Sequence, residues 1–155
     1  MGVFTDLRGA ATRVVPTPVE ECFALLAAVD RYPDWYPEAV RDVDVLERDP
    51  AGRPQKARTH LHLSWGPVVK EFDLVFAVAL EPSTAVSLTK VSDAPSQQRF
   101  DVAWRLGEQR GTRLALDLRA TLDVPRFLPL GGIGDAIANG FVGAAARALA
   151  PAAPA

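Results

Sequence analysis

The feature that most constrains this fold is an alternation of apolar and polar side chains with a period of two, which begins near Arg58 and continues to Leu122. Successive side chains of a β-strand point to opposite faces of a sheet, so this alternation predicts strands that have one apolar face. Five segments carry it, and short turns such as GP and EPST separate them: RTHLHLSW, EFDLVFAVAL, AVSLTKV, QRFDVAWRL and RLALDLRATL. The sequence therefore predicts an antiparallel meander with a single apolar face.

The register predicted from the turns keeps apolar residues beside apolar residues throughout the meander. The predicted neighbours are Leu61 and Phe72, Val78 and Leu88, Leu88 and Phe100, and Trp104 and Leu114. A slip of one residue would move a whole strand's apolar side chains to the other face, so this consistency supports the sheet.

Two short helices are predicted before the meander. A short strand, TRVV, is followed by Thr17 as N-cap and Pro18 as the first residue of a helix. The next stretch, RYPDWYPEAV, contains two prolines and therefore has room for only a short second helix or turn. A further strand is predicted in VRDVDVLERD.

A long C-terminal helix is predicted to cover the apolar face. In GGIGDAIANGFVGAAARALA one helical stripe contains Ile133, Ile137, Phe141, Ala144 and Ala148. The polar residues on this segment are sparse and define the opposite, wet side of the helix. We therefore expect this helix to lie against a strongly bent sheet.

This order of elements resembles the helix-grip fold of the START-like (SRPBCC) superfamily. The stretch VVPTPVEECFALLAAVDRYPDWYPEAVRDVDVLERDPAGRP is similar to the N-terminal signature of its polyketide cyclase/dehydrase and coenzyme-Q-binding branch. The resemblance extends from Thr12 to Leu149. It implies an α+β fold: a curved antiparallel sheet of about seven strands, two short N-terminal helices, one long C-terminal helix and a cavity between sheet and helix.

Length and composition narrow the classes of partner. The 155 residues fit one domain, which we place at residues 1–150, with a disordered tail at 151–155. A net charge of −2 without basic clusters gives no reason to expect nucleic acid as a partner. No apolar run approaches the ~20 residues of a spanning helix, and the first residues do not form a signal peptide. With its single cysteine, Cys22, the chain is expected to be cytoplasmic, and nothing specifies its oligomeric state.

The predicted cavity is the first candidate site. The sheet face is aromatic and the helix stripe contains small residues, which leaves room for a pocket of ~300–1,000 Å³. The alternative is a close-packed core in which the aromatic side chains fill that space. The candidate ligand-binding residues are Trp35, Tyr36, Trp65, Phe72, Phe76, Lys90, Gln98, Phe100, Trp104, Ile137 and Phe141.

Two groups at the rim of this cavity allow alternative interpretations. Tyr32, Trp35 and Tyr36 either contact ligand at the mouth or anchor the short helix to the sheet, and we favour the anchor. Lys90 and Gln98 have inward parity and are predicted neighbours that would offer two donors to a carbonyl or hydroxyl group. The alternative, which we favour, is that the lysine stem reaches water at the rim.

Other chemistry receives little support. His60 and His62 are predicted to lie opposite Asp73 and Glu71, a set that could ligate a divalent metal. They face the convex side, however, and cross-strand pairs of this kind are common on solvated sheets. No nucleophile, catalytic residue, metal or cofactor is therefore predicted, and Cys22 lies within a helix without a histidine nearby.

Two functions from different classes fit these observations, and the first is preferred. The first is binding or transport of a small hydrophobic ligand such as a lipid, an isoprenoid or quinone, or an aromatic polyketide. The second is a cyclase or dehydratase that folds a polyketide in the same cavity, with Lys90, Gln98 or Tyr36 as polar assistants. A protein–protein adaptor that uses the convex face is a third class.

Overall fold

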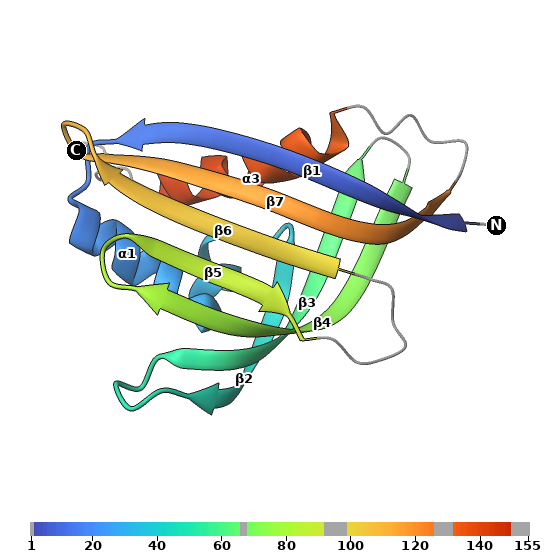
Figure 1. Ribbon diagram of the computed structural model, residues 1–155, viewed down its shortest axis with the longest axis horizontal. Coiled ribbons are helices and arrows are strands. Elements are labelled where there is room, and N and C mark those ends of the chain that lie inside the picture. The colour runs from blue at the N-terminus through green and yellow to red at the C-terminus, as the bar shows by residue number, and fades with distance from the viewer. Residues whose placement is uncertain (1, 66–67, 92–98, 126–131, 150–155) are drawn as a thin grey trace.

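The computed structural model describes residues 2–65, 68–91, 99–125 and 132–149, and these form one sheet and a small set of helices (Figure 1). The strands are β1 (Gly2–Val15), β2 (Val40–Arg48), β3 (Pro54–Trp65), β4 (Val68–Glu81), β5 (Ala85–Lys90), β6 (Arg99–Glu108) and β7 (Thr112–Pro125). The helices are α1 (Val19–Ala27), the 3₁₀ turn η1 (Val29–Arg31), α2 (Tyr32–Trp35) and α3 (Ile133–Leu149). The predicted tail at 151–155 lies outside the described residues.

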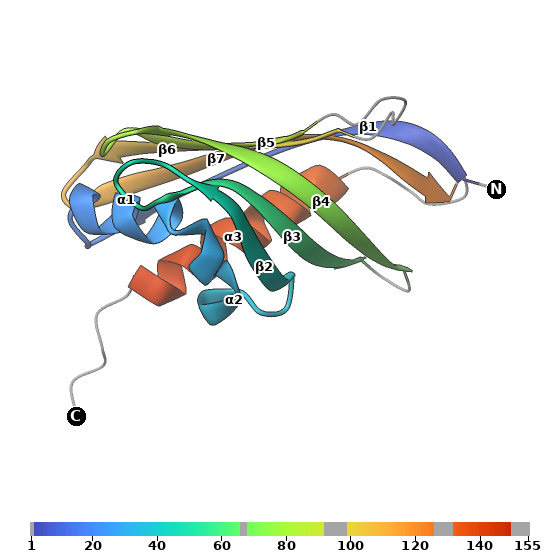
Figure 2. The ribbon, with the colours of Figure 1, turned by 90° about the horizontal axis from the view of Figure 1, so that it is seen from below.

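The seven strands form one antiparallel sheet in the order β1-β7-β6-β5-β4-β3-β2. Every neighbouring pair except β1 and β7 is consecutive in sequence, so β2 to β7 make the predicted meander. Figure 2 shows the helices on one side of the curved sheet, with α3 running along the inside of the curve. The predicted α+β helix-grip architecture is confirmed.

The register is confirmed in the first two hairpins and wrong in the last two. Leu61 lies opposite Phe72, and Val78 opposite Leu88, as predicted. The later pairs are shifted by two residues: Leu88 lies opposite Val102, and Trp104 opposite Leu116. A shift of two keeps each side chain on its face, so the apolar pattern alone does not detect it.

The first strand is much longer than the predicted TRVV segment. β1 has 14 residues and pairs with β7 along its whole length, from Gly2 opposite Pro125 to Val15 opposite Thr112. Glycine and alanines at positions 9–11 weaken the alternation there, so the pattern in the sequence does not reveal the strand.

The start of α1 also differs from the prediction. Pro18 occupies the N-cap position, and Thr17 makes no capping hydrogen bond. The Thr17 hydroxyl instead donates to the Leu149 carbonyl at 2.6 Å, and the Thr112 hydroxyl donates to the Thr17 carbonyl at 2.7 Å. These bonds join the beginning of α1 to the end of α3 and the beginning of β7.

Helix α3 lies chiefly along β1, and small residues allow a close approach. Gly9 meets Gly134 so closely that a Cβ atom at either glycine would overlap the backbone of the other segment. The stripe residues Ile133, Ile137, Phe141 and Ala144 are buried, whereas Ala148 is exposed, so the prediction for the last turn is wrong. Because the glycines bring α3 against β1, its small side chains do not leave the volume that the sequence suggested.

The helices that the structure describes include none that is both long and apolar enough to cross a membrane.

Candidate functional site

A small apolar cavity lies between the concave face of the sheet and the helices. Its volume is about 20 Å³, so the expected pocket of several hundred Å³ is wrong for this structure. The lining comes from η1, α2, α3 and strands β2 to β6: Val29, Tyr32, Val40, Val43, Thr59, Leu61, Phe76, Leu88, Phe100, Val102, Trp104 and Phe141. We call this space the inner cavity.

Aromatic side chains fill most of the space beneath the helices. Trp104 is fully buried, and Phe100 is 1 % exposed. The rings of Phe76 and Phe100 meet edge to face, with centroids 5.9 Å apart. This packing, together with the close approach of α3 to β1, explains why the cavity is small.

A second hollow of about 130 Å³ lies beside the inner cavity, and we call it the mouth hollow. The segment between α2 and β2, strand β3 and the first half of α3 line it: Tyr36, Glu38, Ala39, His62, Leu63, Ser64, Ile133, Ala136 and Ile137. It is partly open to the surface.

Two aromatic side chains stand between the mouth hollow and the inner cavity. Tyr36 lines the first, Phe141 lines the second, and their rings meet edge to face with centroids 4.9 Å apart. On its other side Tyr36 stacks on Trp35, with centroids 6.3 Å apart. The Tyr36 hydroxyl lies against Gly140, where a Cβ atom would overlap it. Burial raises the pKa of this phenol further above neutral pH.

Tyr32 supports the floor of the inner cavity. Its hydroxyl donates to the Leu26 carbonyl at 2.7 Å, and its ring packs at 4.7 Å from that of Trp35. Burial raises the pKa of the Tyr32 phenol far above its usual range, and the nearby Trp104 indole N–H lowers it slightly. Tyr32 is therefore a neutral, fixed side chain.

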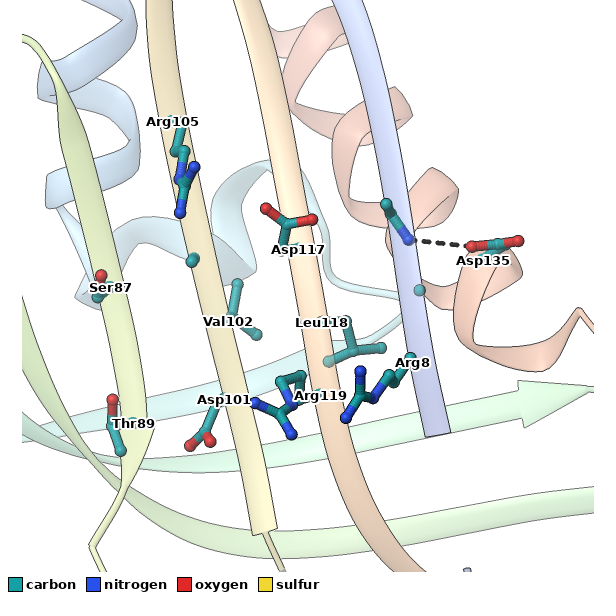
Figure 3. A pocket seen from close by; sticks show the side chains of 13 residues that line it. Arg8, Ser87, Thr89, Asp101, Val102, Arg105, Asp117, Leu118, Arg119 and Asp135 are labelled. Atoms are coloured by element: carbon teal, nitrogen blue, oxygen red, sulfur yellow. Dashed lines mark hydrogen bonds between the residues drawn. The ribbon is translucent and has the colours of Figure 1, made fainter. Parts of the chain in front are cut away.

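A larger hollow, of about 630 Å³, lies on the opposite, outer face of the sheet over β1, β7, β6 and β5 (Figure 3). Its rim is charged: Arg119 lies directly opposite Asp101 on one side and Arg8 on the other. Asp135 accepts a hydrogen bond from the backbone N–H of Ala10 at 3.0 Å. This outer hollow is shallow and open to water, unlike the usual apolar site for a small molecule.

The two histidines lie where the register predicted them. His60 is opposite Asp73 and His62 opposite Glu71. Both imidazoles approach Glu71, with His62 Nδ1 at 3.1 Å and His60 Nε2 at 3.6 Å from its Oε1. Among the residues that the structure describes, no group of three or more His, Cys, Asp or Glu side chains is arranged to hold a metal ion.

The structure brings most of the candidate residues to one region. Phe76, Phe100, Trp104 and Phe141 line the inner cavity, and Tyr36 and Ile137 line the mouth hollow. Trp35 packs behind Tyr36, and Phe72 is buried on the inner face without lining either space. The candidates Gln98 and the Trp65 side chain lie outside the described part of the structure.

The partial exposure of Lys90 fits the favoured interpretation that its stem reaches water at the rim, whereas the predicted cross-strand neighbour does not follow from the observed register. Lys90 lies opposite Phe76 and is partly exposed. The register shift between β5 and β6 removes the basis for the predicted pairing with Gln98, because Leu88 lies opposite Val102 instead of Phe100.

Thr59 and Tyr32 are lining residues that were absent from the candidate set. The sequence indicated Thr59 by its place on the inward-facing side of the alternation, and Tyr32 by the aromatic residues that follow it.

Comparison with known proteins places these features in a family. Residues 15–150 match the family described as polyketide cyclase / dehydrase and lipid transport. No curated protein matches the chain.

Solved structures with low sequence identity share the fold. A START superfamily protein from Mycobacterium smegmatis is similar, with a TM-score of 0.74, 14% identity and coverage of 92% of this chain and 96% of that chain. The Zhui aromatase/cyclase from Streptomyces sp. R1128 gives 0.57, 19% identity and coverage of 97% and 100%. The di-domain ARO/CYC protein BexL gives 0.64 and 11% identity, and the match covers 96% of this chain but 51% of that one.

The family match spans most of the chain, and the curved sheet around a C-terminal helix is the fold that the resemblance implied. The chain therefore belongs to the polyketide cyclase/dehydrase and lipid transport family.

Proposed function

We propose that this protein binds a small hydrophobic ligand, such as a lipid, an isoprenoid or quinone, or an aromatic polyketide, between the sheet and α3. The observation that carries the proposal is the inner cavity, which is apolar and is separated from the mouth hollow by the Tyr36 and Phe141 side chains. The family, described by polyketide chemistry and lipid transport, supports the same class of ligand.

Binding requires the inner cavity to expand, and the energies allow it. Rotating Tyr36 and Phe141 apart gives up an aromatic contact worth about 0.5–1.5 kcal/mol. A ligand that buries roughly 300 Å² of apolar surface gains about 7.5 kcal/mol at 25 cal/mol per Å², before the cost of association. The gross gain exceeds the loss of this one contact, and the remainder has to offset association and the repacking of the core.

The proposed contacts follow from this geometry. Phe76, Phe100 and Trp104 would form the floor and walls around the ligand, while Phe141 would move aside to admit it. Tyr36 and Ile137 would contact ligand at the mouth, and Lys90 would remain at the rim.

A second candidate function is cyclisation or dehydration of a polyketide in the same space. The similarity to the Zhui aromatase/cyclase and to BexL favours it. The lining gives it less support, because Tyr32 is the one titratable side chain among the described lining residues and its phenol is held neutral. Positioning of a reactive chain, without strong acid–base catalysis, is the mechanism that such a lining allows.

Native mass spectrometry of the purified protein, followed by organic extraction, tests the proposed function first. We expect a bound apolar molecule, or binding of one N-phenyl-1-naphthylamine molecule per chain when the protein is isolated empty. An empty protein that also does not bind this dye would contradict the proposal.

A matched pair of variants tests the route of entry. Ala136 is exposed and lines the mouth hollow, so Ala136→Trp should obstruct it without disturbing the core. Asn139→Trp places the same side chain at an exposed position of α3 outside that lining. We expect dye association at least several-fold slower in Ala136→Trp and unchanged in Asn139→Trp, with unchanged Tm in both.

A further inference from the structure

Two polar groups in the lining of the inner cavity have no hydrogen-bond partner. They are the hydroxyl of Thr59 and the indole N–H of Trp104. Thr59 is 4% exposed and Trp104 is fully buried, so bulk water does not solvate either group. Most buried polar side chains in proteins are hydrogen-bonded, and an unpaired one lowers stability. The pair therefore requires an explanation.

The side chains directly opposite Thr59 offer its hydroxyl group no hydrogen-bond partner. Thr59 lies on the inner face of β3, directly opposite Val43 of β2 and Leu74 of β4. Both neighbours are aliphatic, and valine would match the shape of threonine at this position. A threonine here places one hydroxyl group in an otherwise apolar wall.

The indole N–H of Trp104 is in a similar position on β6. The Tyr32 oxygen lies close enough to it to feel the N–H dipole, but the two groups do not reach hydrogen-bond geometry. The Tyr32 hydroxyl donates to the Leu26 carbonyl, which fixes the direction of its O–H; its oxygen can still accept, but it lies outside hydrogen-bond geometry with the indole. An indole N–H can only donate, so any partner that Trp104 takes must be an acceptor.

We infer that the ligand carries an uncharged hydrogen-bond acceptor, of carbonyl or quinone type, which Thr59 and Trp104 bind inside the inner cavity. The inference rests on the proposed function, because both groups line the same space. A hydroxyl group donates as readily as it accepts, so an acceptor satisfies both residues. An ionised acceptor is excluded, because no cationic side chain is among the described lining residues and a lone buried charge is strongly unfavourable.

The inner cavity itself fits this assignment. About 20 Å³ has room for one water molecule, which needs polar partners to be held there. A carbonyl oxygen of the ligand is of similar size and would take that place. The ligand is therefore an apolar ring system or chain in which at least one carbonyl-type oxygen lies within its hydrophobic part.

A pair of probes that differ in one oxygen tests the inference. Fluorene and 9-fluorenone have nearly the same shape, and fluorenone adds a carbonyl group. We expect the native protein to bind fluorenone about five- to tenfold more tightly than fluorene, which corresponds to one net hydrogen bond. Thr59→Val should remove most of this preference and keep the affinity for fluorene. The control Thr89→Val, at an exposed position of β5, should keep the preference.

The possible outcomes separate the inference from the proposed function. Equal affinity for the two probes in the native protein, or an unchanged preference in Thr59→Val, overturns the inference and leaves hydrophobic binding intact. Failure to bind either probe overturns both. Trp104→Phe opens space as well as removing the donor, so its readout is the ratio of the two affinities, which should also fall.

The ligand-free protein gives an independent readout. Because the Thr59 hydroxyl has no protein partner, Thr59→Val should keep or raise the Tm. A fall of several degrees would mean that the hydroxyl is bonded within the protein, and would overturn the inference whatever the probes do.

Discussion

The two faces of strands β6 and β7 differ in both chemistry and packing. On the inner face Trp104, Leu116 and Leu118 are buried beneath helices, and the remaining cavity is about 20 Å³. On the outer face Arg105, Asp117 and Arg119 border a hollow of about 630 Å³ that is open to water. We propose the smaller space as the ligand site, because it is apolar and contains buried polar groups that lack partners. On that proposal, the size of a hollow is a poor guide to function in this fold.

The largest effect on stability is expected where the inner face of the sheet contacts α3. Gly9→Ala on the inner side of β1 would push a Cβ atom into the backbone of α3 at Gly134. Because backbone cannot rotate away as a side chain does, we expect a loss of about 3 kcal/mol in the free energy of unfolding. Urea denaturation followed by circular dichroism measures it.

Gly107→Ala is the matched control on the outer face. Gly107 lies in β6, and a Cβ atom there would meet nothing within 4 Å. This change should leave stability within about 0.5 kcal/mol of the native protein, or raise it slightly, because alanine is less flexible than glycine in the unfolded chain. A similar loss in both variants would mean that α3 does not hold the inner face as the structure shows.

A smaller effect is expected at the wall between the mouth hollow and the inner cavity. Gly140→Ala would displace the Tyr36 hydroxyl, which lies at the end of a side chain that can rotate. Helix propensity favours alanine by about 1 kcal/mol, which offsets the lost packing, so the net change in stability should be within about 0.5 kcal/mol. Exchange of N-phenyl-1-naphthylamine should become several-fold faster in stopped-flow fluorescence.

Gly143→Ala tests whether the faster exchange comes from Tyr36. A Cβ atom at Gly143 would make only ordinary contacts, with the side chains of Arg147 and Arg13. This variant should gain up to about 1 kcal/mol of stability through the same helix propensity and keep the native exchange rate. Faster exchange in both variants would assign the effect to α3 as a whole instead of to Tyr36.

Most of the fold was predictable because alternation reports which face a residue occupies. It predicts that Phe76, Phe100 and Trp104 lie on the inner face, and the structure confirms that all three are buried there. It could not determine the register of the last two hairpins, because Leu88 has an apolar neighbour whether it lies opposite Phe100 or opposite Val102. It also missed most of β1, where small residues serve the contact with α3 and interrupt the pattern.

The site was less predictable than the fold. Small residues on α3 suggested an open pocket, but their consequence depends on how near the helix lies, and the Gly9–Gly134 contact determines that distance. Thr59 showed inward parity in the sequence, yet whether its hydroxyl has a partner is a property of the three-dimensional packing alone. Volume and hydrogen-bond satisfaction depend on distances between segments, which a single sequence does not contain.

The smallest effect is expected on the outer face, at the contact of Glu71 with the two histidines. The hydrogen bond from His62 is the main cause that lowers the pKa of Glu71 from the ordinary value of 4.5. A carboxylate whose pKa is lowered by folding stabilises the protein at pH values above its pKa in the unfolded chain. This contribution is lost as the pH falls through the lower pKa of the folded state.

Glu71→Gln should therefore reduce the Tm slightly above roughly pH 4.5, where the glutamate is ionised. The difference from the native protein should shrink at more acidic pH, and also in 1 M salt, where charges are screened beyond about 3 Å. A difference that persists in 1 M salt would mean that Glu71 acts through packing, and that the outer face contributes more to stability than its exposure to water implies.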